Sequence, residues 1–343
     1  MKHLLNTLFV TSEDIYLSLD GENIVANRDK EVLARYPLHT LCSVVSFSYA
    51  GASPALMGAC AQRGVSLAFC SPRGKFWARI SGETQGNVLL RRTQYRVADD
   101  PAQSCRIART MIFGKIHNAR WSIERTRRDH GMRVDTETLA EASMTLKSLL
   151  PSVLEETDLD RLRGLEGVGA ATYFGVLDQM ILNGKETFFF HGRSRRPPLD
   201  PFNALLSFAY HLLSHDCAAA LESVGLDPYV GFLHRDRPGR TSLALDLMEE
   251  LRPCMADRFV LTLVNNRIIK HTDLAEQENG AVRMTDAGRR SFLQHWQEKK
   301  KDLLTHPYLR EKLPWGLVPY VQALLLARYL RNDLDDYPTF LWK

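Results

Sequence analysis

Short alternating runs of apolar and polar residues fill the first 80 positions, and this period of two predicts β-strands. Six such runs lie at residues 7–11, 14–19, 23–27, 44–49, 65–70 and 76–80. The triplet Asp20-Gly21-Glu22 separates the second run from the third and predicts a tight hairpin. Residues 54–63 favour one short helix instead, which Gly64 is expected to end.

Beyond residue 86 the apolar residues recur at helical spacing. Residues 87–97 are apolar and basic and are compatible with a helix. Asp99, Asp100 and Pro101 then break the chain before a long helical pattern. Helical segments are expected at 102–130, 136–150, 156–182, 201–223, 241–251, 254–271, 286–304 and 314–332. A polar, glycine-containing stretch at 276–284 has the pattern of a hairpin. We therefore expect an α+β fold: a small N-terminal β-rich domain at 1–86, a linker at 87–100 and a larger all-α domain at 101–343.

The composition fits this division. With 343 residues, 45% of them hydrophobic and 24% charged, the chain is long enough for two folded domains, and disorder is excluded as a general description. The net charge of +4 is too small to indicate a polyanionic partner by itself. The cysteines form no CxxC pair and are expected to be reduced, mostly buried thiols: Cys42, Cys60, Cys70, Cys105, Cys217 and Cys254. No apolar run has membrane-spanning length and no secretory leader is recognisable, so the cytoplasm is the expected compartment.

The segment 231–253 combines one histidine, a basic loop and two acids. His234 ends an apolar run and is followed by the arginines of the loop, Arg235, Arg237 and Arg240. In the helix that follows, Asp246 and Glu249 are three residues apart and share a face. Carboxylates suit Mg²⁺ or Mn²⁺, and one imidazole favours Mn²⁺ somewhat. The alternative is a solvated helix face on which Glu249 pairs with Arg252, and these residues alone leave both interpretations open.

Glu166 is the only acid in the glycine-rich and apolar stretch 161–174. A carboxylate in such surroundings needs a partner, because an unpaired buried charge is costly. A metal ion would serve, and so would Arg161 or Arg163. Taken alone, this stretch favours the ion pair with an arginine.

A basic, proline-stiffened loop precedes the helix expected at 201–223. Its arginines, Arg193, Arg195 and Arg196, could bind DNA phosphates. Asn203 and Tyr210 lie two helical turns apart and therefore share one face. The alternative is a solvated charge run beside a core tyrosine.

Together these segments resemble the CRISPR-associated integrase family Cas one, the endonuclease of spacer acquisition. The resemblance covers essentially the whole chain. It is carried by Leu165-Glu166-Gly167, by the run RPPLDPFNALLS at 196–207, and by GFLH at 231–234 followed by SLALDLMEE at 242–250. The arginine-proline loop resembles the subtype I-C branch.

The resemblance implies that Glu166, His234 and Glu249 hold Mg²⁺ or Mn²⁺. Asp246 matches a second acid of the family site, and the last acid is aspartate in several branches, so the third ligand is Glu249 or Asp246, with Glu249 preferred. The DNA-binding set that we expect is Arg193, Arg195, Arg196, Asn203, Tyr210, Arg235, Arg237 and Arg240.

The resemblance also implies an activity and partners. The helical domain would be the catalytic, metal-dependent one, and the β-rich domain would serve dimerisation. The enzyme would insert short duplex DNA into a CRISPR repeat array by 3′-hydroxyl attack on phosphodiesters, contributing to antiviral defence. It would work as a homodimer with the small partner Cas two, and with Cas four in this subtype. The competing interpretations are a general repair-type DNA or RNA nuclease and a non-catalytic nucleic-acid-binding scaffold.

Overall fold

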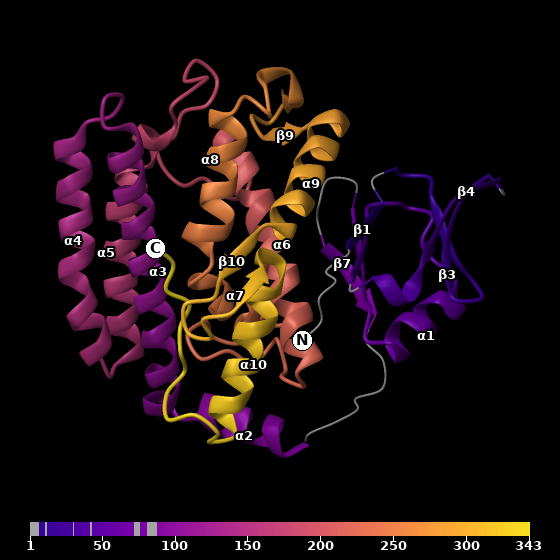
Figure 1. Cartoon of the computed structure of the whole chain (residues 1–343), viewed down its shortest axis with the longest axis horizontal. Coiled ribbons are helices and arrows are strands. Elements are labelled where there is room, and N and C mark those ends of the chain that lie inside the picture. Colours follow the sequence, from indigo (N-terminus) through magenta and orange to yellow (C-terminus); the bar gives the residue numbers. More distant parts are fainter. Residues whose placement is uncertain (1–6, 11, 30, 42, 72–75, 81–87) are drawn as a thin grey trace. The chain divides into compact units, whose positions relative to one another are not determined.

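The computed structural model describes residues 7–10, 12–29, 31–41, 43–71, 76–80 and 88–343 (Figure 1). The chain divides into two compact units. The first unit comprises residues 1–86 together with 293–302, and the second comprises 87–292 together with 303–343. The mixed α+β class expected from the sequence is confirmed, with strands gathered in the first 80 residues and helices dominating the remainder.

Within its described residues 7–80, the first unit contains two small sheets, the helix α1 and the short 3-10 helix η1 (Leu38–Thr40). An antiparallel sheet joins β2 (Tyr16–Asp20), β3 (Asn23–Arg28) and β4 (Glu31–Pro37). A second sheet has the order β1-β5-β6-β7, in which β1, β5 and β6 run parallel and β7 is antiparallel. The bounds of these strands and of the helix are β1 (Thr7–Val10), β5 (Ser43–Ser46), α1 (Pro54–Gln62), β6 (Ser66–Cys70) and β7 (Phe76–Ile80). Both sheets and α1 contribute to one apolar core.

Local sequence signals explain most of this unit. Asp20 pairs with Asn23 around Gly21, whose φ of 57° suits glycine, so the predicted hairpin is confirmed. Ser53 caps α1 by accepting a hydrogen bond from the backbone of Leu56. Strand β4 was not predicted: its side chains are mostly exposed, so it lacks the one-sided apolar alternation that marks a half-buried strand. Thr11, at the end of the first predicted strand, lies outside the described residues.

The second unit is built mainly of helices, with α3, α4 and α5 side by side and α6, α8 and α10 beyond them (Figure 1). Its helices are α2 (Val88–Asp99), α3 (Pro101–His130), α4 (Thr136–Glu155), α5 (Leu159–Leu177), η2 (Asp178–Met180), α6 (Pro201–Ser223), α7 (Ser242–Glu249), η3 (Arg252–Asp257), α8 (Arg258–Asn265), η4 (His271–Asp273), η5 (Trp315–Leu317) and α10 (Val318–Leu330). Helix α9 (Asp286–Lys301) begins in this second unit, and its residues from 293 onward are assigned to the first unit. Two short hairpins are formed by β8 (Leu274–Glu276) with β9 (Val282–Met284) and by β10 (Leu303–Thr305) with β11 (Lys312–Pro314).

Aspartate caps fix where the long helices begin. Asp100, Asp135, Asp158 and Asp200 each accept hydrogen bonds from backbone N–H groups in the first turn of α3, α4, α5 and α6. Helix α6 occupies the predicted range, and the hairpin expected at 276–284 is present as β8–β9.

The structure refines three local expectations. The residues expected as a linker form α2, in keeping with their apolar and basic pattern, and the amide of the buried Gln94 donates to the carbonyls of Asp227 and Val230 and ties this helix to the unit. The helix expected at 241–251 ends before Pro253 as predicted, but Pro253 itself lies inside η3, a π-helical turn that runs into α8. The helix expected to reach residue 304 ends at 301, before β10.

Two further expectations concern cysteines and membranes. Cys60, Cys105, Cys217 and Cys254 are buried cysteines; the Cys42 and Cys70 side chains lie outside the described residues. None of the described helices combines the length and apolar character that crossing a bilayer requires.

Candidate active site

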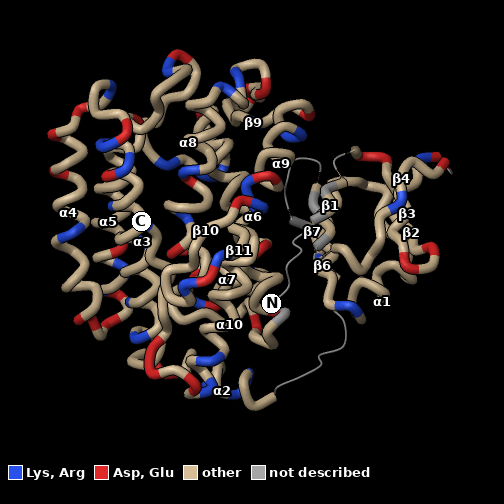
Figure 2. The backbone as a smooth tube through the Cα atoms, in the orientation of Figure 1, with Lys and Arg blue, Asp and Glu red and all other residues tan. Residues whose placement is uncertain are grey.

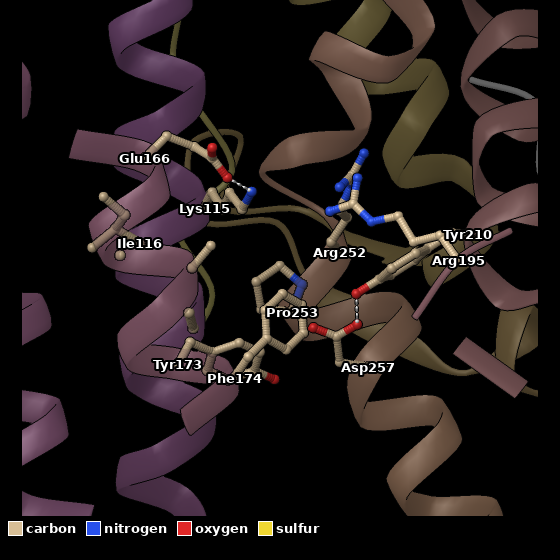
Figure 3. Close-up of a pocket in the computed structure, with 13 residues that line it drawn as sticks. Lys115, Ile116, Glu166, Tyr173, Phe174, Arg195, Tyr210, Arg252, Pro253 and Asp257 are labelled. Carbon is tan, nitrogen blue, oxygen red and sulfur yellow. Dashed lines mark hydrogen bonds and ion pairs between the residues drawn. The ribbon is translucent and has the colours of Figure 1, made fainter. Parts of the chain in front are cut away.

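Two of the predicted acids converge on a lysine. Glu166 on α5 and Glu249 at the end of α7 both form ion pairs with the Nζ of Lys115 on α3, and the Nζ–Oε2 distance to Glu249 is 2.7 Å. Figure 3 shows the Lys115 ammonium directed toward Glu166 between the helices. The side chain of Lys115 is 12% exposed, that of Glu166 27% and that of Glu249 4%. The tertiary fold therefore brings together two carboxylates that are 83 positions apart in the chain.

His234 faces the same cluster. Its Nε2 lies 3.9 Å from Oε1 of Glu249, and its Nδ1 lies 2.5 Å from Oδ1 of Asp246. A neutral imidazole that donates from Nδ1 presents a lone pair at Nε2, so the bond to Asp246 turns the free nitrogen toward Glu249.

Asp246 is fully buried and positions the loop that carries His234. Its carboxylate accepts backbone N–H bonds from Phe232, Leu233 and His234, at 2.6, 2.9 and 3.0 Å, in addition to the imidazole bond. With four donors on two oxygens, this carboxylate is occupied by the protein itself. Asp246 is therefore a positioning residue, and Glu249 is the acid of α7 that reaches the cluster.

Glu249 is held ionised although it is buried. Burial would raise the pKa of its carboxyl group, but Arg252, then Lys115 and His234, lower that pKa from 4.5 to about 2. The guanidinium of Arg252 lies 3.1 Å from Oε1 of Glu249. The ion pair with Arg252 that the sequence suggested thus exists, but it is part of a buried cluster and not of a solvated helix face.

The partner of Glu166 differs from both arginines that the sequence offered. Arg163 donates to the carbonyl of Leu233 at 2.6 Å and pairs with Asp160, so it holds the loop just before His234. The carboxylate of Glu166 pairs instead with Lys115, which no local motif marked. A lysine from a helix 51 positions earlier can be assigned to this cluster only when the packing of α3 against α5 is known.

The donor set fits a divalent cation in its chemistry. Two carboxylates and one imidazole nitrogen, from Glu166, Glu249 and His234, are typical ligands for Mg²⁺ or Mn²⁺. Within the described part of the chain, no group of three His, Cys, Asp or Glu side chains already has the geometry of a metal-binding site. The Lys115 ammonium lies between the two carboxylates.

A pocket adjoins the cluster. Lys115 and Glu166 line one side, and Arg252, Tyr210 and Asp257 line the other (Figure 3). The Tyr210 hydroxyl donates to Oδ1 of Asp257 at 2.6 Å. Burial raises the pKa of Asp257 to about 6, against the lowering effect of that bond and of Arg252. The hydroxyl of Tyr210, a residue predicted to contact DNA, is thus bonded to the buried carboxylate of Asp257, which no sequence motif indicated.

The basic loop before α6 divides into inward and outward residues. Arg193 donates to Asn203 at 2.6 Å and to Ser207 at 3.1 Å, and its guanidinium lies over the Tyr210 ring. Asn203 is fully buried, and its amide also donates to the carbonyl of Gly192. This corrects the expectation that Asn203 contacts DNA: its side chain fixes the loop and cannot reach a strand outside it.

The other predicted arginines are more accessible. Arg195, Arg196, Arg235 and Arg237 are exposed, and Arg240 is half-buried. Arg235 pairs with Asp160 on α5 at 3.1 Å. Burial, and then the neighbouring Arg237, lower the pKa of Arg240. Figure 2 shows Lys and Arg interleaved with Asp and Glu along the helices, in keeping with the small net charge.

This arrangement can be compared with known proteins. The sequence model of the family described as CRISPR associated protein Cas1 matches residues 8–298. The chain belongs to the Cas1 family. A relative from Rhodospirillum rubrum, named CRISPR-associated endonuclease Cas1 2, is 52% identical over 347 residues, and the match covers 100% of both chains. The family predicted from the motifs is thereby confirmed.

Solved structures share the fold. A casposase bound to its integration product gives a TM-score of 0.84 at 20% identity, covering 99% of this chain and 95% of that one. A chain of a Cas6-RT-Cas1–Cas2 complex gives a TM-score of 0.80 at 21% identity, covering 100% of this chain and 36% of that one. At these identities the similarity concerns the fold.

Proposed function

We propose that this Cas1-family chain is a metal-dependent DNA endonuclease and integrase that inserts short duplexes into a CRISPR array. The observation that carries the proposal is the convergence of Glu166, Glu249 and Nε2 of His234 from three separate segments at one partly buried position. Acids held this close together are unusual in a purely structural core, because burying several charges is costly without a function or full pairing.

Each residue has a distinct task in this proposal. Glu166, His234 and Glu249 would hold Mg²⁺ or Mn²⁺, and the ion would stabilise charge on the oxygens of the attacked phosphodiester. Asp246 orients the His234 imidazole, and Arg252 fixes the Glu249 carboxylate.

The bond changes balance without a cofactor that carries energy. A 3′-hydroxyl of the incoming duplex attacks a phosphorus atom of the repeat, a new phosphodiester forms, and the target's bond to its own 3′ oxygen breaks. The proton lost by the attacking hydroxyl is balanced by one gained on the leaving 3′ oxygen. Water in place of the hydroxyl gives hydrolysis, the endonuclease reaction. The exposed arginines Arg195, Arg196, Arg235 and Arg237 would bind backbone phosphates.

Partners follow from the family and from the names of similar structures. We propose DNA as substrate, a homodimer formed through the β-rich unit, and Cas2 as the small partner. The casposase with its integration product and the complex that contains Cas1 and Cas2 support DNA and Cas2. Subtype I-C, and with it assistance by Cas4, rests on the arginine-proline run at 195–198.

The test is strand transfer of a labelled short duplex into a repeat-containing plasmid, with Mn²⁺ and with or without Cas2. We expect Glu166→Ala and His234→Ala to lower transfer by a factor on the order of 10² to 10³, because each removes a group that stabilises the reacting phosphate. DNA binding, measured separately, should persist. Glu141→Ala, on an exposed position of α4, is the matched control.

The same assay separates the alternatives. Unchanged transfer in both variants would leave only a scaffold role. Cleavage of branched DNA or RNA without any joining to the repeat would indicate a general nuclease.

A further inference from the structure

Lys115 occupies a special place in the site. It lies on α3, a helix that none of the predicted motifs touches, yet its ammonium reaches the two carboxylates that the proposed function assigns to metal binding. Within the described residues it is the cation that pairs with Glu166. Its side chain is 12% exposed, so little solvent screens these pairs.

The ammonium uses the oxygens that a metal ion would need. Oε1 of Glu166 and Oε2 of Glu249 face the Lys115 Nζ, at 2.7 Å in the case of Glu249. A divalent ion binds carboxylate oxygens through the same lone pairs, at about 2.0–2.1 Å in the case of Mg²⁺. A lysine ammonium and a metal ion therefore cannot share this position.

Without a cation at this position, the carboxylates of Glu166 and Glu249 would repel each other. Glu249 keeps the Arg252 guanidinium, but Glu166 would lose its paired charge and would face another carboxylate in partly desolvated surroundings. Like charges at such separations repel by an amount that grows as water is excluded. The ammonium removes this repulsion and keeps α5 and α7 at the spacing that the site requires.

We propose that Lys115 is a built-in counter-cation, which holds Glu166 and Glu249 in position in the metal-free protein and is displaced when the divalent ion binds. This inference rests on the proposed metal site. Metal binding is then a competition: the ion must replace an existing charge, which lowers its affinity. In return the carboxylates are already placed when the ion arrives.

The first experiment is calorimetric titration of the full-length, DNA-free protein with MnCl₂. Lys115→Met keeps the length of the side chain and removes its charge, so the Mn²⁺ dissociation constant should fall at least tenfold, as expected when a competing unit charge a few ångströms away is removed. Lys115→Arg keeps the charge and should not tighten binding. Lys147→Met, at an exposed position on α4, is the matched control and should match wild type.

The second experiment needs no variant and therefore stands even if Lys115→Met does not fold. Lysine acylation of the wild-type protein, followed by mass spectrometry, compares side-chain reactivity without Mn²⁺ and at saturating Mn²⁺. Lys115 should react several-fold faster when the ion is bound, because its ammonium has been released, while Lys147 should not change. Equal or slower labelling of Lys115 at saturation overturns the proposal.

The outcomes distinguish the two proposals. If wild-type protein binds no Mn²⁺, the metal site and the role of Lys115 both fail. If it binds Mn²⁺ and Lys115→Met binds it equally well or more weakly, only the counter-cation role fails, and the metal-dependent function stands.

Discussion

At the scale of single residues, the pocket beside the site is dominated by one buried carboxyl group. Asp257 accepts the hydroxyl of Tyr210 and lies near Tyr173, Arg252 and Arg193. Burial is the largest influence on this group and outweighs the hydrogen bonds and guanidinium charges, so its pKa rises from 3.8 to about 6. The folded protein therefore holds a proton at pH values where the unfolded chain has lost it.

This raised pKa predicts a pH-dependent loss of stability. Because the pKa is higher in the folded state, the stabilisation is fully present below about pH 4 and is lost as pH rises through about 6. A shift of this size corresponds to about 3 kcal/mol. Asp257→Asn mimics the protonated form and still accepts from Tyr210, so its free energy of unfolding should lack this pH-dependent loss. The difference between the variant's and the wild type's free energies of unfolding should therefore change by about that amount, in favour of the variant, between pH 4 and pH 7. Urea denaturation followed by circular dichroism measures it, and parallel pH profiles would contradict it.

At the scale of elements, the loop 231–240 and helix α7 act as one piece. Asp246 on α7 receives the backbone of Phe232, Leu233 and His234, and Gly231 lies so close that a Cβ there would stand 2.8 Å from the Asp246 carboxylate. Leu243, Leu247 and Leu251 are fully buried and anchor the helix beneath the loop. The backbone geometry of the loop therefore sets the orientation of the His234 imidazole, and rotation about its own side-chain bonds does not.

The coupling of loop and helix makes Asp246→Asn informative. An amide offers one acceptor oxygen and a competing N–H₂, so some of the four donors lose their partner and the His234 ring loses its orientation. We expect Mn²⁺ affinity to fall about 10- to 100-fold, as when the support of a metal-binding histidine is removed. Calorimetric titration measures it. Asp236→Asn, at an exposed position of the same loop, should bind as wild type does, and equal affinities in all three proteins would show that Asp246 does not position the ligand.

At the scale of the whole molecule, charge is spread and not concentrated. The net charge is +4, and basic and acidic side chains alternate over the helices (Figure 2). In the proposed function, DNA affinity would then depend on a few arginines placed near the site. Of the arginines in the loop before α6, Arg193 is bonded to Asn203 and faces inward, Arg195 is exposed and lines the pocket beside the site (Figure 3), and Arg196 is exposed.

This division predicts two different phenotypes within one loop. Replacing Arg195 and Arg196 by glutamine should weaken DNA binding and reduce the slope of log K against log salt by about 0.9 for each lost phosphate contact. Arg193→Gln should mainly lower the melting temperature, because its guanidinium bonds three groups of the loop and of α6. Fluorescence anisotropy at several salt concentrations and thermal unfolding separate the two. A salt slope changed only by Arg193→Gln would reverse the assignment.

The features that the amino-acid sequence determined by itself are those encoded by neighbours in the chain. The hairpin at Gly21 follows from a local turn preference, and the beginnings of α3 and α6 follow from an aspartate cap with proline behind it. The motifs around Glu166, His234 and Glu249 also indicated the family, because each is a short contiguous run. Strand β4 escaped prediction since its side chains are exposed on both faces. The attachment of α2 to the helical unit was not predicted because Gln94 bonds to residues more than 130 positions later.

Only the tertiary structure decided which groups meet. Lys115 is an unremarkable lysine in its own helix, and it becomes the partner of two acids because α3 packs between α5 and α7. In the same way the sequence preferred Glu249 to Asp246 as the third ligand without excluding Asp246, and the fold separates their roles because the loop backbone occupies the Asp246 carboxylate. Pairing energies depend on distance and burial in three dimensions, and neither quantity is a property of a residue's position along the chain.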